Sequence, residues 1–298
     1  MAKAYVLYNP IAGGGQSEEA LRRLKELLTD DAVFCDMTKN EDYNTDITSM
    51  DKDNYIIVCG GDGTLNRFAN SLSGINVEND IRYFPCGSGN DFARELGKEK
   101  YCAPFSIKKY LEGMPTVTVN GESSLFLNGV GYGIDGYCCE IGDKERAESD
   151  KPVNYTAIAI KGLLFHYKPT NARVTVDGKE YNFKKVWIAP TMNGKYYGGG
   201  MMPTPSQDRC AEDGKLSVMI FHGSSALKTL MIFPSLFKGE HIKHTKHVTV
   251  IEGYDISVDF DAPRTVQIDG ETILGVSGYR AISAKLANTK NATEAAAF

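Results

Sequence analysis

Short apolar runs alternate with stretches of helical periodicity through the first 120 residues. Strand-length runs occur at residues 4–8, 32–36, 55–59 and 82–85. Between the first two, leucines 21, 24, 27 and 28 fall on one face of a helix predicted over residues 17–28. Strands that alternate with helices are typical of a parallel sheet with right-handed crossovers. We therefore predict an α/β N-terminal domain over residues 1–120.

From about residue 117 the pattern changes to period-two runs that turn dipeptides separate. Asp177-Gly178 between two alternating segments predicts a hairpin. Further strands are predicted at 186–190, 216–221, 248–251, 256–260, 265–269 and 281–286, with helices at 155–167 and 226–237. Many short strands indicate a sandwich or flattened barrel. We predict a mostly β sandwich domain over residues 121–298, in which residues 288–298 form a loosely held tail.

The candidate chemistry is concentrated where the strand at 55–59 enters a glycine-rich segment. That segment reads Gly60-Gly61-Asp62-Gly63-Thr64-Leu65-Asn66 and precedes a helical stretch. Glycines between a strand and a helix leave backbone N–H groups accessible to a bulky anion. A carboxylate would repel a bare phosphate, so Asp62 favours a Mg²⁺ ion between it and phosphate oxygens. The alternative is a tight turn with a capping aspartate.

Two further loops have the same context. Residues 9–15, Asn-Pro-Ile-Ala-Gly-Gly-Gly, follow the first strand, and residues 86–94, Cys-Gly-Ser-Gly-Asn-Asp-Phe-Ala-Arg, follow the fourth. In a parallel sheet all three loops lie at the carboxyl edge, where open α/β folds bind ligands. None carries the lysine of a P-loop or the spacing of a dinucleotide fingerprint.

Carboxylates before strands mark two more candidate sites in the second half. Asp213-Gly214 and Asp269-Gly270-Glu271 each fit a simple turn as well as a functional site. The glycine-rich segment 128–136 predicts a close backbone approach to substrate, with a bulged strand as the alternative. The helix at 226–237 is expected to pack into the core. The alternative is that its apolar face lies beside the basic segment 241–247 where that segment contacts anionic lipid head groups. We expect the histidines at 241–247 to lie in a solvated basic segment.

Composition excludes several classes of protein. A formal net charge of −5 and a pI near 5.6 argue against nucleic-acid binding. The seven cysteines include no C-x-x-C pair, and no signal peptide is evident, so we expect reduced thiols in a cytoplasmic protein. No apolar stretch approaches the length of a membrane span.

The three glycine loops, in their order and spacing, resemble the diacylglycerol kinase catalytic family, and more closely its soluble bacterial lipid kinases. The resemblance covers most of the chain, since Asp213-Gly214 and Asp269-Gly270-Glu271 extend it. It implies an N-terminal domain like that of NAD kinases and phosphofructokinases. It also implies a kinase that moves the γ-phosphate of ATP to a lipid hydroxyl, most simply that of diacylglycerol.

The resemblance assigns roles to individual residues. Glu271 is the implied general base and Asp269 its competitor, while Asp62 would orient a catalytic Mg²⁺. Asp213 would bind a structural Mg²⁺ with the backbone carbonyls of Cys210 and Lys215. The implied nucleotide contacts are Asn9, Pro10, Ala12, Gly13, Thr38, Gly60, Gly61, Asp62, Gly63, Thr64, Leu65, Asn66 and Ser88.

Two other functions stay open on the sequence alone. An NAD kinase shares Gly-Gly-Asp-Gly and a β-rich second domain, but the Asn9-Pro10 loop and the loop at 86–94 argue against it. The other is a catalytically silent regulator that binds nucleotide or lipid. For a lipid kinase we expect membrane lipid at the bilayer surface as partner, no nucleic acid, and a peripheral location when active. Whether the chain forms a homodimer is open.

Overall fold

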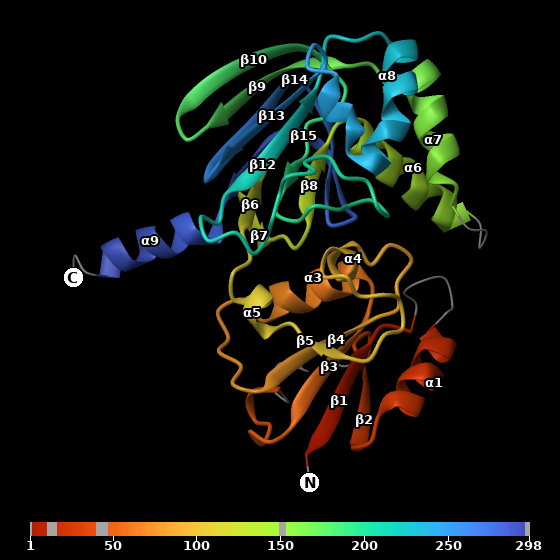
Figure 1. The fold of residues 1–298 in the computed structure, drawn as a ribbon, viewed down its shortest axis with the longest axis vertical. Helices are drawn as coiled ribbons and strands as arrows, with labels where there is room; N and C mark the ends of the chain where they lie inside the picture. Colours follow the sequence, from red (N-terminus) through yellow and green to blue (C-terminus); the bar gives the residue numbers. More distant parts are fainter. Residues whose placement is uncertain (1, 11–16, 40–46, 149–152, 296–298) are drawn as a thin grey trace. The chain divides into compact units, whose positions relative to one another are not determined.

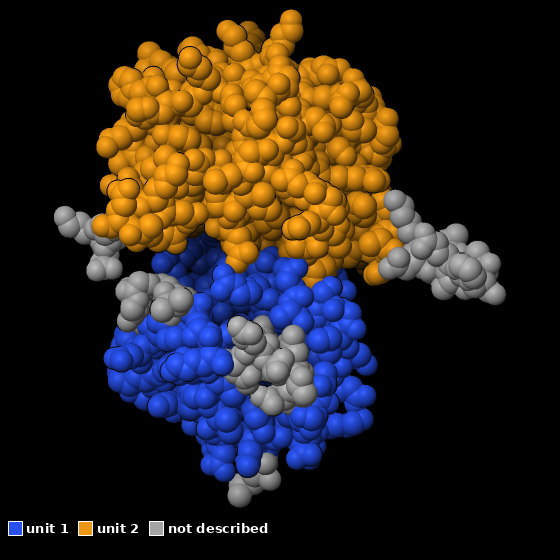
Figure 2. Space-filling view, turned by 180° about the vertical axis from the view of Figure 1, so that it is seen from behind, with its two compact units in different colours: residues 1–113 blue, residues 114–298 orange. Residues whose placement is uncertain are grey.

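The computed structural model describes residues 2–10, 17–39, 47–148 and 153–295. The chain divides into two compact units, residues 1–113 (unit 1) and 114–298 (unit 2), coloured separately in Figure 2. The division falls seven residues before the expected boundary at 120. The reason is that residues 116–119 form a strand that pairs with the last strand of unit 2.

Unit 1 is built on a five-stranded sheet in the order β2-β1-β3-β4-β5 (Figure 1). Strands β1 (Lys3–Tyr8), β2 (Asp31–Asp36), β3 (Tyr55–Gly60) and β4 (Asp80–Pro85) are parallel, as predicted, and the short β5 (Phe105–Ser106) is antiparallel. All residues of β3 are buried, which explains its unbroken apolar sequence. The helices are α1 (Ser17–Leu27), α3 (Asp62–Ser71), α4 (Asp91–Glu95) and α5 (Lys108–Leu111).

Unit 2 is mostly β, as predicted. Its strands are β6 (Thr116–Val119), β7 (Glu122–Leu125), β8 (Gly129–Tyr132), β9 (Thr170–Val176), β10 (Lys179–Val186), β11 (Thr191–Met192), β12 (Leu216–Phe221), β13 (Val248–Gly253), β14 (Asp255–Ile268) and β15 (Glu271–Ile282). The long β14 pairs with β9 through residues 256–260 and with β8 through residues 266–268. This switch of partner carries one strand across two parts of the sheet around a shared apolar core.

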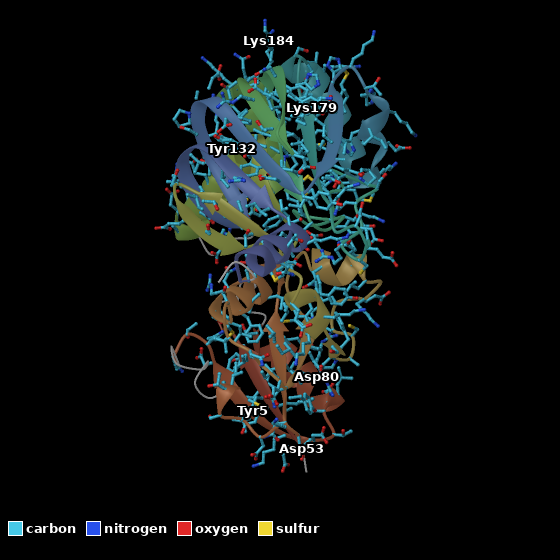
Figure 3. The ribbon with its side chains drawn as sticks, turned by 90° about the vertical axis from the view of Figure 1, so that its left-hand side faces the viewer. Tyr5, Asp53, Asp80, Tyr132, Lys179 and Lys184 are labelled. Carbon is cyan, nitrogen blue, oxygen red and sulfur yellow. The ribbon has the colours of Figure 1, made fainter. Side chains whose placement is uncertain are left out.

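Tyr132 lies in that core and is labelled in Figure 3. Its ring stacks on Phe260 at a centroid distance of 3.9 Å, and its hydroxyl donates to the carbonyl oxygen of Val276. The two contacts join β8, β14 and β15. A buried tyrosine with a satisfied hydroxyl therefore helps to fix the register of three strands that lie far apart in sequence.

Helical segments cover part of unit 2 (Figure 1). They are α6 (Ile134–Glu148), α7 (Tyr155–Lys161), the π-helical turn η1 (Gly162–His166), α8 (Ala226–Ile232), the 3₁₀ turns η2 (Phe233–Lys238) and η3 (Glu240–Lys243), and the C-terminal α9 (Ala284–Ala295). Within the described part of the chain, no helix combines the length and the apolar character needed to cross a membrane.

Several predicted elements of unit 2 need correction. The strand expected at 186–190 is not formed: Val186 ends β10, and Ile188 makes only isolated bridges. The two strands expected within 256–269 are the single strand β14. The strand expected at 281–286 includes only the last two residues of β15, which ends at Ile282. The Ser283 hydroxyl then accepts a hydrogen bond from Leu286 N, and α9 begins. The expected loose tail at 288–298 is thus helical as far as Ala295.

Candidate functional site

The two glycine loops after β3 and β4, and the start of the loop after β1, lie at one edge of the unit 1 sheet. Strands β1, β3 and β4 are parallel neighbours, so their carboxyl ends meet there. Asn9 and Pro10 follow β1 directly. Ala12 and Gly13 lie outside the described residues. Gly60 ends β3, and the third loop begins at Cys86 after β4.

A small hollow of about 70 Å³ opens at this edge. Asn9, Met37, Thr38, Thr64 and Arg67 line it. Three of these residues, Asn9, Thr38 and Thr64, are predicted nucleotide contacts from three different segments of the chain. The structure therefore places these three side chains around one hollow, whereas the sequence predicted only that their loops lie at the same edge of the sheet.

Thr38 is held in place by the end of β2. Its backbone N–H and its hydroxyl both donate to Asp36 Oδ1, at 2.9 and 2.6 Å. The Thr38 hydroxyl lowers the pKa of the Asp36 carboxyl. The hydroxyl oxygen keeps its acceptor capacity for a ligand in the hollow.

Arg67 is the residue at this hollow that sequence reasoning missed. It is an exposed side chain of α3, three positions after Thr64, so the two lie on the same helix face. The helical spacing was a usable signal, because a cation beside hydroxyl and amide groups suits a phosphate.

Asp62 ties the second glycine loop to the third. Its carboxylate accepts the backbone N–H of Asp91 at 2.9 Å and that of Phe92 at 2.9 Å. These are the first two residues of α4, so Asp62 caps a helix that lies 29 positions further along the chain. A carboxylate can accept several such bonds at once. Asp62 therefore fixes the third loop through the start of α4.

Two glycines make the close approach of these loops feasible. A Cβ atom on Gly87 would lie 2.4 Å from the Cα atom of Gly61, and one on Gly61 would lie 3.1 Å from the Cα atom of Gly87. The Gly60 carbonyl accepts the backbone N–H groups of Cys86 and Gly87, at 2.9 and 3.2 Å. The loops thus meet backbone to backbone, without room for a side chain between them.

The remaining predicted nucleotide residues differ in their exposure. Ser88 is exposed, and Gly63 and Thr64 are half-buried. Leu65 and Asn66 point into unit 1, where Leu65 is fully buried and Asn66 accepts a hydrogen bond from the Asn70 amide at 2.9 Å. The backbone N–H of Leu65 donates to the Gly61 carbonyl oxygen at 3.0 Å.

The two carboxylates at the β14–β15 turn occupy different environments. Asp269 accepts the backbone N–H groups of Leu127, Asn128 and Gly129, the latter two at 2.8 and 3.1 Å. Glu271 is exposed at the first position of β15. The carboxylate of Asp269 is thus engaged in holding the 127–129 segment, while Glu271 is an exposed residue.

The predicted metal ligands of the Asp213 turn lie close together in sequence and space. Asp213 Oδ1 accepts the Lys215 N–H at 3.3 Å, and Asp213 Oδ2 lies 3.1 Å from the Lys215 ammonium. The Lys215 carbonyl accepts from the Gln207 amide at 2.9 Å, and Cys210 N donates to Asp208 Oδ1. Carboxylate and carbonyl oxygens suit Mg²⁺, but the exposed Lys215 ammonium would have to move aside.

The glycine-rich segment 128–136 is packed against its own unit. A Cβ atom on Gly131 would lie 1.7 Å from Asp135 Oδ2, and one on Gly136 would lie 2.0 Å from the Thr265 carbonyl oxygen. Asp135 is buried at the start of α6, and burial raises the pKa of its carboxyl to about 6. The close approach that these glycines permit is therefore internal.

The histidine segment also differs from expectation. His241 is fully buried, and its Nε2 atom lies 2.8 Å from the Pro203 carbonyl oxygen. Burial lowers the pKa of its imidazole. The first histidine of 241–247 is a packing residue and not part of a solvated basic segment. Within the described residues, no cluster of three or more His, Cys, Asp or Glu side chains could hold a metal ion.

Comparison with known proteins agrees with this architecture. Residues 3–118 match the family model of the diacylglycerol kinase catalytic domain, and residues 128–285 match that of the YegS C-terminal NAD kinase beta sandwich-like domain. Together the two matches span most of the chain.

Relatives and solved structures resemble the chain over most of its length. It is 26% identical over 255 residues to a protein of Mycobacterium tuberculosis named diacylglycerol kinase, a match that covers 82% of this chain and 81% of that protein. It is 27% identical to a Staphylococcus haemolyticus protein provisionally named a lipid kinase, over 85% and 79% of the two chains. A crystal structure titled as a diacylglycerol kinase from Bacillus anthracis shares the fold, with a TM-score of 0.63, 21% identity, and coverage of 95% and 94%.

Proposed function

Since the chain belongs to the diacylglycerol kinase catalytic-domain family and is a lipid kinase, we propose that it phosphorylates diacylglycerol at a bilayer surface. The reaction would move the γ-phosphate of ATP to the free hydroxyl and form phosphatidic acid. The observation that carries the proposal is the edge of the unit 1 sheet, where Asn9, Thr38, Thr64 and Arg67 surround one hollow beside glycine loops.

The nucleotide would bind at this edge. Backbone N–H groups of the glycine loops suit the phosphates, and Arg67 would add a positive charge near them. A Mg²⁺ ion held by Asp62 would neutralise charge on the phosphate oxygens when bound. Because Asp62 already fixes the start of α4, loop geometry and metal affinity would depend on the same carboxylate.

Glu271 would act as the general base. The support comes from its neighbour, since Asp269 is engaged by three backbone N–H groups and is poorly placed to take a proton as well. Glu271 is exposed, so an acceptor hydroxyl would have access to it. In phosphoryl transfer the base needs only to remove that proton as the oxygen attacks phosphorus.

Asp213 would hold a second, structural Mg²⁺ together with the Cys210 and Lys215 carbonyls. The hard oxygen donors support this role, and the ion would take the place that the Lys215 ammonium occupies beside Asp213. On this proposal Lys215 serves as a counter-ion whenever the metal is absent.

The direct test is a transfer assay with γ-labelled ATP. The acceptor panel in mixed micelles would hold diacylglycerol, a glycolipid, a long-chain base and phosphatidylglycerol, with NAD as the water-soluble competitor. We expect label in phosphatidic acid and none in NADP. Label in a different lipid would show that this lipid, and not diacylglycerol, is the acceptor. Label in NADP alone would refute the assignment of a lipid acceptor.

A further inference from the structure

Exposed apolar side chains gather on two neighbouring helical segments of unit 2. Eight of the twelve exposed large apolar side chains among the described residues fall in residues 155–165 and 227–242. The helix α8 contacts the turn η1, so these segments adjoin, as Figure 1 shows. We define the apolar helical surface as Ile160, Leu164, Phe165, Leu227 and Met231. The expectation that 226–237 serves core packing thus holds for only one side of that segment.

The core does not need this surface. The opposite sides of the same segments supply Leu163, Ile232 and Leu236, which are buried in one apolar cluster of unit 2. By contrast, Phe165 is 75% exposed and Met231 is 63% exposed. Apolar side chains of this size, gathered on adjoining elements of a protein surface, mark a binding surface rather than a fold requirement.

The charges around the surface indicate what covers it. Residues 154–168 and 225–238 contain no aspartate or glutamate, although the whole chain carries a net charge of −5. The same stretches contain Lys161, Lys168, Lys228 and Lys238. Lysines that flank exposed apolar side chains suit an anionic lipid interface, where the apolar tips enter the acyl boundary and the ammonium groups meet head groups.

A hollow next to this surface has matching chemistry. It has a volume of about 460 Å³, and its lining includes His166, Lys168, Arg264 and Glu140. The one carboxylate, Glu140, is already engaged by the Lys144 ammonium and the Thr265 hydroxyl, each at 2.6 Å. The cationic side chains therefore set the charge of the hollow, which suits a lipid phosphate.

We propose that the apolar helical surface, with its flanking lysines, docks unit 2 onto an anionic bilayer. This inference rests on the proposed lipid kinase function, because a chain that acts on a membrane lipid must reach it. Two short amphipathic segments bind a membrane reversibly, which suits an enzyme that associates with the membrane peripherally. The alternative occupant is a second copy of this chain. In a C₂ dimer the same surface pairs with itself, so the four lysines of one copy would face the four lysines of the other and repel them.

The test is vesicle binding by the full chain. Phe165→Glu and Met231→Glu should each lower the partition onto vesicles that contain phosphatidylglycerol by about tenfold or more. Lys228→Ala should lower it by about fivefold, and high salt should remove that difference. The matched control is Leu27→Glu, at a position 45% exposed on the glutamate-rich α1, which should bind like the wild type.

A second readout separates this inference from the proposed function. Phe165→Glu and Met231→Glu should keep wild-type turnover on a short-chain, water-soluble diacylglycerol and lose turnover on vesicle-embedded substrate. A wild type that phosphorylates no diacylglycerol at all would refute the function instead. Variants that bind anionic vesicles as well as the wild type would overturn the docking surface. So would sedimentation velocity that shows a wild-type dimer and a Met231→Glu monomer.

Discussion

The strongest test of the candidate site compares two carboxylates that lie two positions apart. Asp269→Asn and Glu271→Gln each remove one negative charge with almost no change in shape. Asp269 has a φ of +48°, a conformation that asparagine tolerates as well as aspartate does, so the backbone of the turn should survive. Any difference between the variants should therefore report on hydrogen bonds and chemistry.

The magnitudes follow from the contacts. Asp269 accepts three backbone N–H groups, and hydrogen bonds to a charged group contribute about 1.5–3 kcal/mol each. Asparagine keeps one acceptor oxygen, which can still serve Asn128 and Gly129, but its amide faces the donor of Leu127. We expect Asp269→Asn to lower the free energy of unfolding by about 2–4 kcal/mol. Glu271 is exposed, so Glu271→Gln should change stability by no more than about 0.5 kcal/mol.

Turnover should show the opposite order. Glu271→Gln should lower kcat by about 10²–10⁴-fold, as removal of a general base does. Urea unfolding measures the first quantity, and initial rates at saturating ATP measure the second. An Asp269→Asn protein of wild-type stability without activity, beside an active Glu271→Gln protein, would show that the base is Asp269.

Four further predictions follow from other contacts. Asp62→Asn should impair every ATP-dependent step, including slow ATP hydrolysis without lipid, because it weakens both the metal site and the cap of α4. Unchanged ATP hydrolysis would contradict the role of Asp62 in metal binding. Arg67→Ala should raise KM for ATP about tenfold, the loss of about 1.4 kcal/mol of phosphate contact, with partial rescue by Arg67→Lys. Asp213→Ala should abolish any rise in melting temperature that Mg²⁺ gives over EDTA while ATP still binds, and a defect in ATP affinity alone would exclude a structural ion there. Burial raises the pKa of Asp135 to about 6, so its protonated form favours folding below about pH 4 and that contribution is lost as the pH rises through 6. In urea unfolding, the free energy of unfolding of Asp135→Asn should lack this loss, and at pH 7 it should exceed that of the wild type by on the order of 3 kcal/mol.

The sequence predicts unit 1 better than unit 2 for a physical reason. Fully buried parallel strands such as β3 are continuous apolar runs, and glycine loops mark their ends. In unit 2 the sequence missed β15, because Gly275 and Gly278 interrupt its alternation. Gly275 has a φ of +67°, and the pairing of β14 with β15 shifts register nearby. Helix α6 was missed as well, since the glycine-rich segment 128–136, which includes its start, was interpreted as a close backbone approach to substrate or as a bulged strand.

The candidate site shows the same division. The loop residues were found because glycines and strand ends are local signals. The tethers made by Asp62 and Asp269 were not found, because their partners lie about 30 and 140 positions away. Nothing local distinguishes an aspartate that caps a distant helix from one that binds a metal. Only the fold brings donor and acceptor together.

The meeting of Gly61 with Gly87 limits how such a kinase can be changed. In most pairs of packed residues, a larger side chain at one position can be accommodated by a smaller one at the other. Here both residues are glycine, so neither can be replaced by a smaller residue. No second substitution can therefore compensate for a larger residue at position 61 or 87. Such a residue requires that β3 and β4 move apart. Redesign of nucleotide preference should begin at Thr38 and Arg67, whose side chains border open space.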